Sequence, residues 1–523
     1  MRLFLLCGLL LASGLTVSLD AQSIDFNDVR RAYNTGSGAV VQGDQVRGYY
    51  ALYQVDKAKG GDRVYQLELL DADLNKLQEQ TLTRPNGTVA LEAKFNGEAI
   101  CLTLINLRKR TIELITYDRT GKKLGQKMFE PENRAFMTLQ QMYNFNEEDG
   151  GAALVRGVPM KGFVFYLPTS DKGVRYTMHY LPNNLKGGWN KPADLKRGKF
   201  QFAASLTATE DYIVTNVTAR PKAAMVKGTI NSIEVRSVAD GSVIGDFLPG
   251  KGSPRMNINN AFYEPESKTF MLGGMYYSPS ADLVKDESTG VAIQRISPKG
   301  ERLESAKVSW TKAFASVGRK KTEHLKKGGS VYLHRLVTKA DGGITAIGEY
   351  YDDEVSAMGV AGALLGGAGG GGSNISLKKI VLQDLFAFNF DGQLEFADAR
   401  IYSKPKRSVE LASGSEFLSP ARLAQLLDAS DAFDYEFMQS YTDRGQTVLA
   451  YTTFEPQKGK MFKQPKFNLI TEYDDEEEPV EKTLDFRTGA TFTTYSEGKP
   501  GYVMVTDYLR KEKRLSLRLE PVD

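Results

Sequence analysis

The chain has 523 residues, of which 41% are hydrophobic and 25% are charged, the ordinary composition of a globular protein. Its formal net charge is only +3, so no overall excess of charge indicates nucleic acid or an anionic membrane as a partner. A chain of this length normally folds into several domains, unless a repeat architecture spreads the core over many small sheets.

The first residues have the pattern of a secretory signal peptide. Arg2 supplies a positive charge, an apolar run covers residues 3–17, and small residues follow near Ala21. The run of roughly 15 apolar residues is short for a membrane span of about 20, so we expect residues 1–21 to be cleaved, leaving no transmembrane segment in the mature chain. An uncleaved anchor is the alternative. The expected location is the bacterial envelope, periplasmic or secreted. Cys101 is then the one remaining cysteine, so a core and not a disulfide must stabilise the fold.

After a polar lead-in at residues 23–44 and a first predicted strand at 46–55, a β-hairpin motif begins to recur. In its first copy, Tyr65, Leu67 and Leu69 alternate with other side chains, and residues 71–75 supply the turn. Equivalent turns are found at Asp118–Gly121, Asp240–Gly241, Ser297–Gly300 and Asp391–Gly392. An Asp followed by Gly gives a tight turn an acceptor side chain and a residue of positive φ, so positive φ is expected at Gly121 and Gly392.

The hairpins recur at spacings of about 47 and about 57 residues, close to the ~40–50 residues of a four-stranded propeller blade. Helical periodicity is nearly absent, and strands do not alternate with helices. We therefore predict an all-β fold, a β-propeller of seven or eight four-stranded blades in a single domain at residues 22–523. The alternative is two β-sandwich domains. Residues 136–143 are assigned to the third group of strands, and 183–199 to a link. The last three strands, within 490–521, are expected to borrow a fourth from residues just after the signal peptide, which closes the ring.

Three insertions interrupt the predicted blades. Residues 311–328 are basic and fit a short helix, whereas 355–375 are rich in glycine and are expected to form a mobile loop. Residues 403–432 contain a predicted helix at Ser419–Asp428, with Ser419 as its N-cap and Pro420 at its first position.

No strong catalytic or metal-binding motif is present in the sequence. The three histidines, His179, His324 and His334, lack the H-E-x-x-H spacing, and there is no C-x-x-C. Residues 71–75 resemble the start of an EF-hand loop, but Lys76 replaces its glycine, so turn chemistry explains them better. No metal site and no cofactor are therefore expected.

The most interesting polar cluster is Tyr350, Tyr351, Asp352 and Asp353, which ends a predicted strand just before the glycine-rich insertion. Carboxylates beside aromatic rings suit a sugar or a divalent ion, or act as acid and base in glycoside hydrolysis. The alternative is a solvated strand end. Trp189 and Trp310, the two tryptophans of the sequence, lie near predicted loops, where they would form platforms for a glycan or simply cover the core.

The leader and the Asp/Gly hairpins resemble secreted bacterial β-propeller-like proteins of unassigned function. A sialidase-type Asp box is incomplete at residues 442–447, and the Trp-Asp dipeptide is missing, so the resemblance transfers no functional residue. We expect an exported, non-enzymatic binding or scaffold protein whose ligand, a glycan or an envelope protein, meets the loop-rich face of the propeller. The alternatives are a carbohydrate-active hydrolase or lyase with a carboxylate pair, and a structural component of an envelope assembly.

Overall fold

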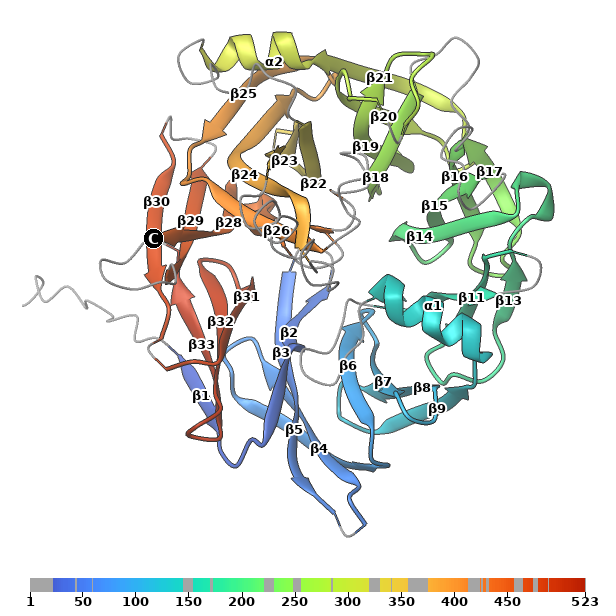
Figure 1. Cartoon of the computed structure of the whole chain (residues 1–523), viewed down its shortest axis with the longest axis vertical. Helices are drawn as coiled ribbons and strands as arrows, with labels where there is room; N and C mark the ends of the chain where they lie inside the picture. Colours follow the sequence, from blue (N-terminus) through green and yellow to red (C-terminus); the bar gives the residue numbers. More distant parts are fainter. Residues whose placement is uncertain are drawn as a thin grey trace, which may run out of the picture.

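The computed structural model describes residues 22–42, 45–58, 60–143, 154–169, 173–220, 230–247, 255–283, 286–318, 330–339, 341–355, 375–412, 424, 427–428, 432–455, 464–473, 478–487 and 489–522. In this part of the chain, the strands form eight antiparallel sheets that follow one another around a ring (Figure 1). The protein is a β-propeller with eight blades. The prediction of the fold class is confirmed, and the alternative of two β-sandwich domains is wrong.

Blades 1 to 7 each contain strands that are consecutive in the chain, whereas blade 8 combines the last three strands with the first strand of the chain. The first strand named for each blade lies nearest the ring axis (Figure 1). Blades 1 to 4 contain, in order, β2 (Arg31–Gln42), β3 (Gln45–Lys57), β4 (Arg63–Asp71) and β5 (Lys76–Arg84); β6 (Thr88–Phe95), β7 (Ala99–Asn106), β8 (Thr111–Asp118) and β9 (Lys123–Phe129); β10 (Arg156–Val158), β11 (Gly162–Thr169), β12 (Arg175–Pro182) and β13 (Trp189–Pro192); β14 (Phe200–Ala208), β15 (Tyr212–Arg220), β16 (Ile230–Ser237) and β17 (Val243–Phe247).

Blades 5 to 8 contain β18 (Arg255–Glu264), β19 (Thr269–Tyr277), β20 (Gly290–Ile296) and β21 (Arg302–Ser309); β22 (Ser330–Thr338), β23 (Ile344–Val355), β24 (Ile375–Phe390) and β25 (Phe396–Tyr402), with β26 (Arg407–Ala412) also paired to β24; β27 (Tyr435–Tyr441), β28 (Gln446–Glu455), β29 (Gln464–Tyr473) and β30 (Val480–Asp485); β31 (Phe492–Glu497), β32 (Tyr502–Leu509), β33 (Arg514–Pro521) and β1 (Ser23–Phe26). Helices α1 (Asn133–Tyr143) and α2 (Trp310–Val317) connect blades, and short 3-10 helices lie at Leu195–Arg197 and Thr442–Arg444.

The ring is closed by β1, as predicted. This strand pairs with β33 at the outer edge of blade 8, and the chain then crosses to β2 in blade 1. Figure 1 shows the first and last blades side by side. The backbone N–H of Val29, between β1 and β2, donates to Lys513 O at 2.8 Å, which ties the crossing segment to blade 8.

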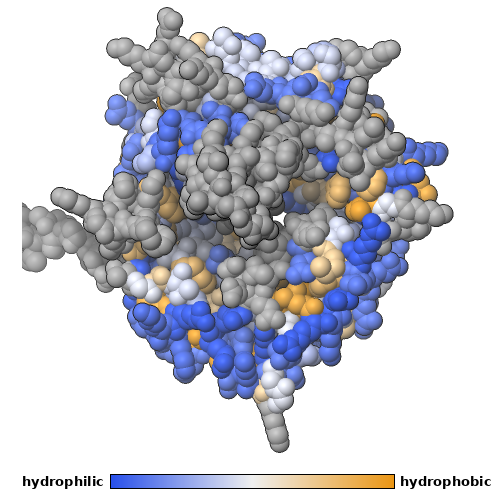
Figure 2. Space-filling view, viewed as in Figure 1, coloured by the Kyte–Doolittle hydropathy of each residue, from blue (hydrophilic) through white to orange (hydrophobic). Residues whose placement is uncertain are grey.

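A cluster of buried apolar side chains lies between each pair of neighbouring blades, so the described core is a chain of eight interfaces. Between blades 1 and 2 it includes Leu67 and Leu102, and between blades 8 and 1 it includes Phe26 and Leu517. The other six interfaces are built in the same way. Each blade therefore contributes to two interfaces. On the face seen in Figure 2, hydrophilic residues predominate and apolar ones form small groups.

The innermost strands are linked through β-bulges. A bulge leaves a residue out of the ladder, for example between Ala90 and Glu92 and between Ile258 and Asn260. The carbonyl beside it then needs a donor from elsewhere. Neighbouring blades provide one: Asn216 Nδ2 donates to Ile258 O at 2.6 Å, and Thr35 Oγ1 donates to Leu91 O.

The hairpin turns at Asp118 and Asp391 have the same hydrogen-bond pattern, and this pattern corrects one expectation. At Asp118 and at Asp391 alike, the N–H of the residue three positions later donates to the Asp carbonyl, and that residue has positive φ. At Asp118 it is Gly121 (φ 78°), as expected. At Asp391 it is Leu394 (φ 62°), so the expectation of positive φ at Gly392 is wrong.

Three segments differ from the sequence-based assignment. The polar lead-in contains β2, the innermost strand of blade 1, and the assumed link 183–199 contains β13. Residues 136–143 form part of helix α1 and not a strand; Phe136 and Leu139, three positions apart, face the core beside blade 3. The innermost position explains β2, because small residues such as Gly36 allow close approach: a Cβ there would lie 2.6 Å from Leu52 O.

The insertions are described in part. The basic segment begins in helix α2, as predicted, and β26 lies within 403–432. Ala424, Leu427 and Asp428 of the predicted helix are helical, while the leader 1–21 and residues 356–374 of the glycine-rich insertion lie outside the described residues. Among the described residues, no helix has the length and apolar character needed to cross a membrane.

Candidate functional site

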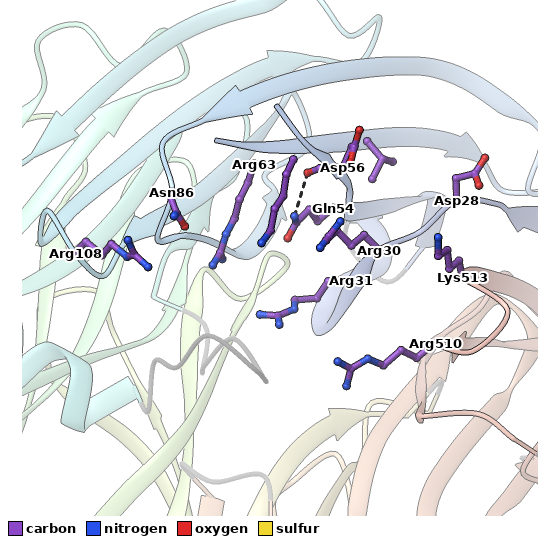
Figure 3. Close-up of a pocket in the computed structure, with 12 residues that line it drawn as sticks. Asp28, Arg30, Arg31, Gln54, Asp56, Arg63, Asn86, Arg108, Arg510 and Lys513 are labelled. Carbon is purple, nitrogen blue, oxygen red and sulfur yellow. Dashed lines mark hydrogen bonds between the residues drawn. The ribbon is translucent and has the colours of Figure 1, made fainter. Parts of the chain in front are cut away.

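A pocket of about 920 Å³ opens where the ring closes, between blades 8, 1 and 2 (Figure 3). We call it the basic pocket. Arg63 and Arg108 lie at one side of the pocket, Asp28 and Lys513 lie at the other, and Arg30 and Arg31 lie between them. Its lining residues are Asp28, Arg30, Arg31, Gln54, Val55, Asp56, Lys57, Arg63, Asn86, Arg108, Arg510 and Lys513.

All of these residues come from one face of the ring. They flank the turns β3–β4, β7–β8 and β32–β33, or lie in the links that lead into β2 and β6. The equivalent turn in blade 6 connects β23 to β24 across residues 356–374, and the link into β22 covers 318–329. These two connections of blade 6 are long, and they leave the ring on the same face as the turns and links that line the pocket. The basic pocket therefore lies on the loop-rich face.

Hydrogen bonds and packing fix the blade 1 and blade 2 side of the pocket. Arg63 is buried, and its Nη1 donates to Thr88 O at 2.7 Å, a carbonyl that also accepts from the Tyr65 hydroxyl at 2.6 Å. The stem of Arg108 lies over Gly87, where a Cβ would come within 2.7 Å of Arg108 Cγ. The side chains are therefore held in place before a ligand arrives, which lowers the entropy cost of binding.

The blade 8 side is fixed by the closure itself. The Tyr508 hydroxyl donates to Arg30 O at 2.9 Å, and Arg30 N donates to Gln54 O at 2.8 Å. Together with the bond from Val29 to Lys513, these contacts hold the segment 28–31 between the two blades. The residues that close the ring thus also form the floor of the pocket.

The pocket is strongly positive. Seven basic side chains line it, against two carboxylates, those of Asp28 and Asp56. Among the described residues, the side chains of Arg30, Lys57, Arg108, Arg510 and Lys513 make no ion pair with a carboxylate. Val55 is the one aliphatic residue of the described lining, which contains no Ser, Cys or His. This arrangement suits recognition of a hydrophilic anion, because guanidinium groups bind carboxylate, sulfate and phosphate bidentately.

The predicted cluster at the end of β23 lies on blade 6, away from the basic pocket. Tyr350 and Tyr351 are buried in two different core clusters, whereas Asp352 and Asp353 are half-buried. Burial raises the pKa of Asp352, with the charges of Asp353 and Glu354 adding to the effect. β23 pairs with β24 as far as Val355, so the two carboxylates belong to a hairpin arm and not to a loose strand end.

The two tryptophans are far apart in the ring. Trp189 lies on β13, stacks on Tyr180 at 5.5 Å and donates its indole N–H to Val238 O at 2.8 Å. Trp310 begins α2 and donates to Ser288 O at 2.8 Å; it packs against the core cluster that contains Tyr350. The structure does not bring the six predicted residues into one site, and their role in ligand binding stays a prediction.

Sequence reasoning missed a buried ionic network between blades 6 and 7. Lys404 Nζ lies 3.1 Å from Glu349 Oε1 and also contacts Asp434, and all three side chains are at most 1% exposed. Glu349 accepts from the backbone N–H of Asp434 at 3.1 Å and lies 3.5 Å from His334 Nε2. Lys404 lies in the insertion predicted at residues 403–432, where no strand or motif pattern indicated a buried ion pair. The basic pocket was missed as well, because its residues are scattered between positions 28 and 513.

No three His, Cys, Asp or Glu side chains of the described residues gather into a group that would hold a metal ion. The absence of a metal and of a cofactor stays a prediction, as does the absence of a nucleic-acid partner. The positive lining of the basic pocket makes it a candidate binding site for a negatively charged ligand.

Solved propellers resemble the chain at low identity. The β-propeller domain of the Trilobed protease from Pyrococcus furiosus is 11% identical, with a TM-score of 0.37 over 87% of this chain and 99% of that one. The WD40 domain of SCAP from fission yeast is 8% identical (TM-score 0.36; 96% and 95% covered), and a post-proline cleaving enzyme from Rickettsia typhi is 8% identical (TM-score 0.40; 92% and 58% covered). No curated protein gives a significant match. A family model, described as a family of unknown function (DUF6770), matches residues 1–523, and the chain therefore belongs to this family.

Proposed function

We propose that the protein is an exported, non-enzymatic binding protein that holds an acidic glycan in the basic pocket on its loop-rich face. The observation that carries the proposal is the charge of the lining: seven basic side chains against two carboxylates, in a cavity of about 920 Å³. Pockets of this size accommodate a ligand of several linked rings. The export of the chain and its place in a bacterial envelope rest on the leader sequence alone.

The chemistry of the lining favours a glycan among anionic ligands. Val55 offers little apolar surface, so a lipid tail or an aromatic ring would gain little there. Gln54, Asn86 and the carboxylates of Asp28 and Asp56 are donors and acceptors suited to hydroxyl groups. The guanidinium groups would bind the carboxylates or sulfates of such a chain.

The alternative of a carbohydrate-active hydrolase or lyase stays open, since Asp28 and Asp56 are also a pair of carboxylates. Binding is favoured, because basic side chains outnumber carboxylates in the lining by seven to two and suit the recognition of an anion.

Isothermal titration calorimetry would test the proposal. The ligands are an oligogalacturonate, a sulfated heparin tetrasaccharide and neutral maltotetraose, each at two salt concentrations. We expect the acidic ligands to bind, more weakly at high salt, and the neutral one not to bind. Arg510→Gln should weaken binding about tenfold or more. The matched control is Lys511→Gln, an exposed lysine of the same turn outside the pocket lining, which should bind as the wild type does. Equal affinity for maltotetraose, or equal effects of the two variants, would refute the proposal.

A further inference from the structure

A second pocket, of about 440 Å³, lies in the inner wall of the ring, at blades 2, 3 and 4. We call it the wall pocket. It is formed by the end of β6, the middle of β14, β10 with the segment leading into it, and β11. It shares no residue with the basic pocket.

The wall pocket exists because the innermost strand of blade 3 is short. β10 has three residues and pairs with β11 only from Gly162 to Val164. Beyond that point the opposite faces of β11 have different neighbours. Phe165 packs towards α1, while Tyr166 points into the wall pocket beside Val164.

Two cations reach this pocket, and one of them, Lys94, acts electrostatically on the buried carboxylate of Glu92. Among the described residues, neither Lys94 on β6 nor Arg156 on β10 makes an ion pair. Arg156 has an exposed side chain on the inner wall of the ring, where the surrounding blades limit its contact with bulk water and lower its pKa. Arg335 on β22, whose Nη1 lies 3.5 Å from Glu497 Oε1, adds to that lowering. A small anion would relieve this accumulation of charge.

A polar atom and an apolar surface complete the site. Ser205 Oγ is buried against the pocket and has no hydrogen-bond partner among the described residues. A buried hydroxyl of this kind is normally satisfied by a ligand or by water. Val164, Phe95 and the ring of Tyr166 form an apolar wall beside it.

The segment that carries Arg156 is held rigidly. The carboxylate Oε1 of buried Glu92 accepts from the N–H of Leu154 at 2.7 Å and of Val155 at 2.8 Å. These bonds fix the two residues before Arg156, so its guanidinium starts from a defined position on the wall.

We propose that the wall pocket binds an acidic monosaccharide, a uronic acid, as a second ligand site of the protein. The sugar carboxylate would lie between Lys94 and Arg156, a ring hydroxyl would hydrogen-bond to Ser205 Oγ, and the C–H face would pack on the apolar wall. The two cations, the hydroxyl of Ser205 and the apolar wall would each contact a different part of the same uronic acid. Inorganic phosphate lacks the apolar face, benzoate lacks the hydroxyls, and glucose lacks the charge.

Titration calorimetry with glucuronate and galacturonate tests this proposal, with glucose, benzoate and phosphate as comparison ligands. We expect a uronate to bind, Arg156→Gln to weaken it about tenfold or more, and Ser205→Ala to weaken it about threefold or more. Lys127→Gln, a surface change on β9 outside the pocket, is the control and should have no effect. The double variant Arg108→Gln/Arg510→Gln should keep uronate binding while losing the acidic oligosaccharide, which separates this site from the basic pocket. The proposal is overturned if glucose, benzoate or phosphate binds as tightly as the uronates, or if Arg156→Gln and Ser205→Ala bind as the wild type does.

Discussion

Replacing Lys404 by Met tests the buried ionic network between blades 6 and 7. The substitution keeps the volume of the side chain but removes a charge that is 0% exposed and lies 3.1 Å from Glu349. In the wild type, burial by itself would raise the pKa of Glu349, but Lys404 and His334 outweigh it and lower the pKa. Without Lys404, the buried carboxylate keeps only the imidazole of His334, 3.5 Å away, and two backbone N–H groups among these contacts.

Breaking a buried ion pair by removing one partner typically costs 3–5 kcal/mol of unfolding free energy. We expect about 3 kcal/mol here, the lower end, because Asp434 keeps its second cation, Arg407, at 2.5 Å. The loss should shrink as the pH falls through the acidic range. In the variant the pKa of Glu349 is no longer lowered, so the carboxyl takes up a proton and its burial costs less.

Urea unfolding followed by circular dichroism measures the effect. The double variant Lys404→Met/Glu349→Gln should recover to within about 1 kcal/mol of the wild type, because Gln still accepts from the N–H of Asp434 and leaves no unpaired charge. A single variant that costs less than about 1 kcal/mol, or a double variant no more stable than the single one, would show that this network does not hold the two blades together.

Three further predictions concern the turns, a half-buried histidine and the closure. Gly121→Val should lower the free energy of unfolding in urea by about 1–3 kcal/mol, because φ is 78° and a Cβ would lie 2.1 Å from Gln78 Cγ. Gly392→Val should change this free energy little, because φ is ordinary there and no atom lies within 3.7 Å of the added Cβ. Equal losses in the two variants would contradict this explanation. Burial, aided by Lys127, lowers the pKa of His179 to about 4, so between about pH 6.5 and pH 4 only the unfolded state binds a proton at this residue. The free energy of unfolding should therefore fall by up to about 3 kcal/mol as the pH falls through this range. His179→Phe should remove this part of the pH dependence, and an unchanged pH profile would disprove the prediction. Phe26→Ala should lower the unfolding free energy by about 3 kcal/mol, because the side chain is 7% exposed and its phenyl ring lies 5.4 Å from that of Tyr53, where the propeller closes. A loss below about 1 kcal/mol in thermal or urea unfolding would mean that β1 contributes little to the stability of the propeller.

The fold could be predicted because blade strands carry their pattern locally. In β4, Tyr65 and Leu67 are fully buried, and the Asp turn that follows fixes the hairpin, so a short window of sequence suffices. The innermost strand β2 has no such pattern. Its Gly36 is required by the carbonyl of Leu52 in the neighbouring strand, a constraint that no local window contains. The same is true of Leu394, whose positive φ follows from the hydrogen bonds of its turn and not from its residue type.

The candidate site could not be predicted for a related reason. Arg30, Arg108 and Arg510 come from three blades or links, and the closure of the ring brings them together. A net charge of +3 averages this local excess away. Conversely, the run of Tyr and Asp at the end of β23 drew attention because its residues are adjacent in sequence, although the two tyrosines face the core.

The most direct test of the central claim is a crystal structure of the protein with a bound acidic oligosaccharide, an oligogalacturonate of four units. The account predicts electron density for the ligand in the basic pocket, with its carboxylates on the guanidinium groups of Arg30, Arg108 and Arg510. Density for the ligand at Asp352 and Asp353, or anywhere else on the ring with the basic pocket empty, would contradict it.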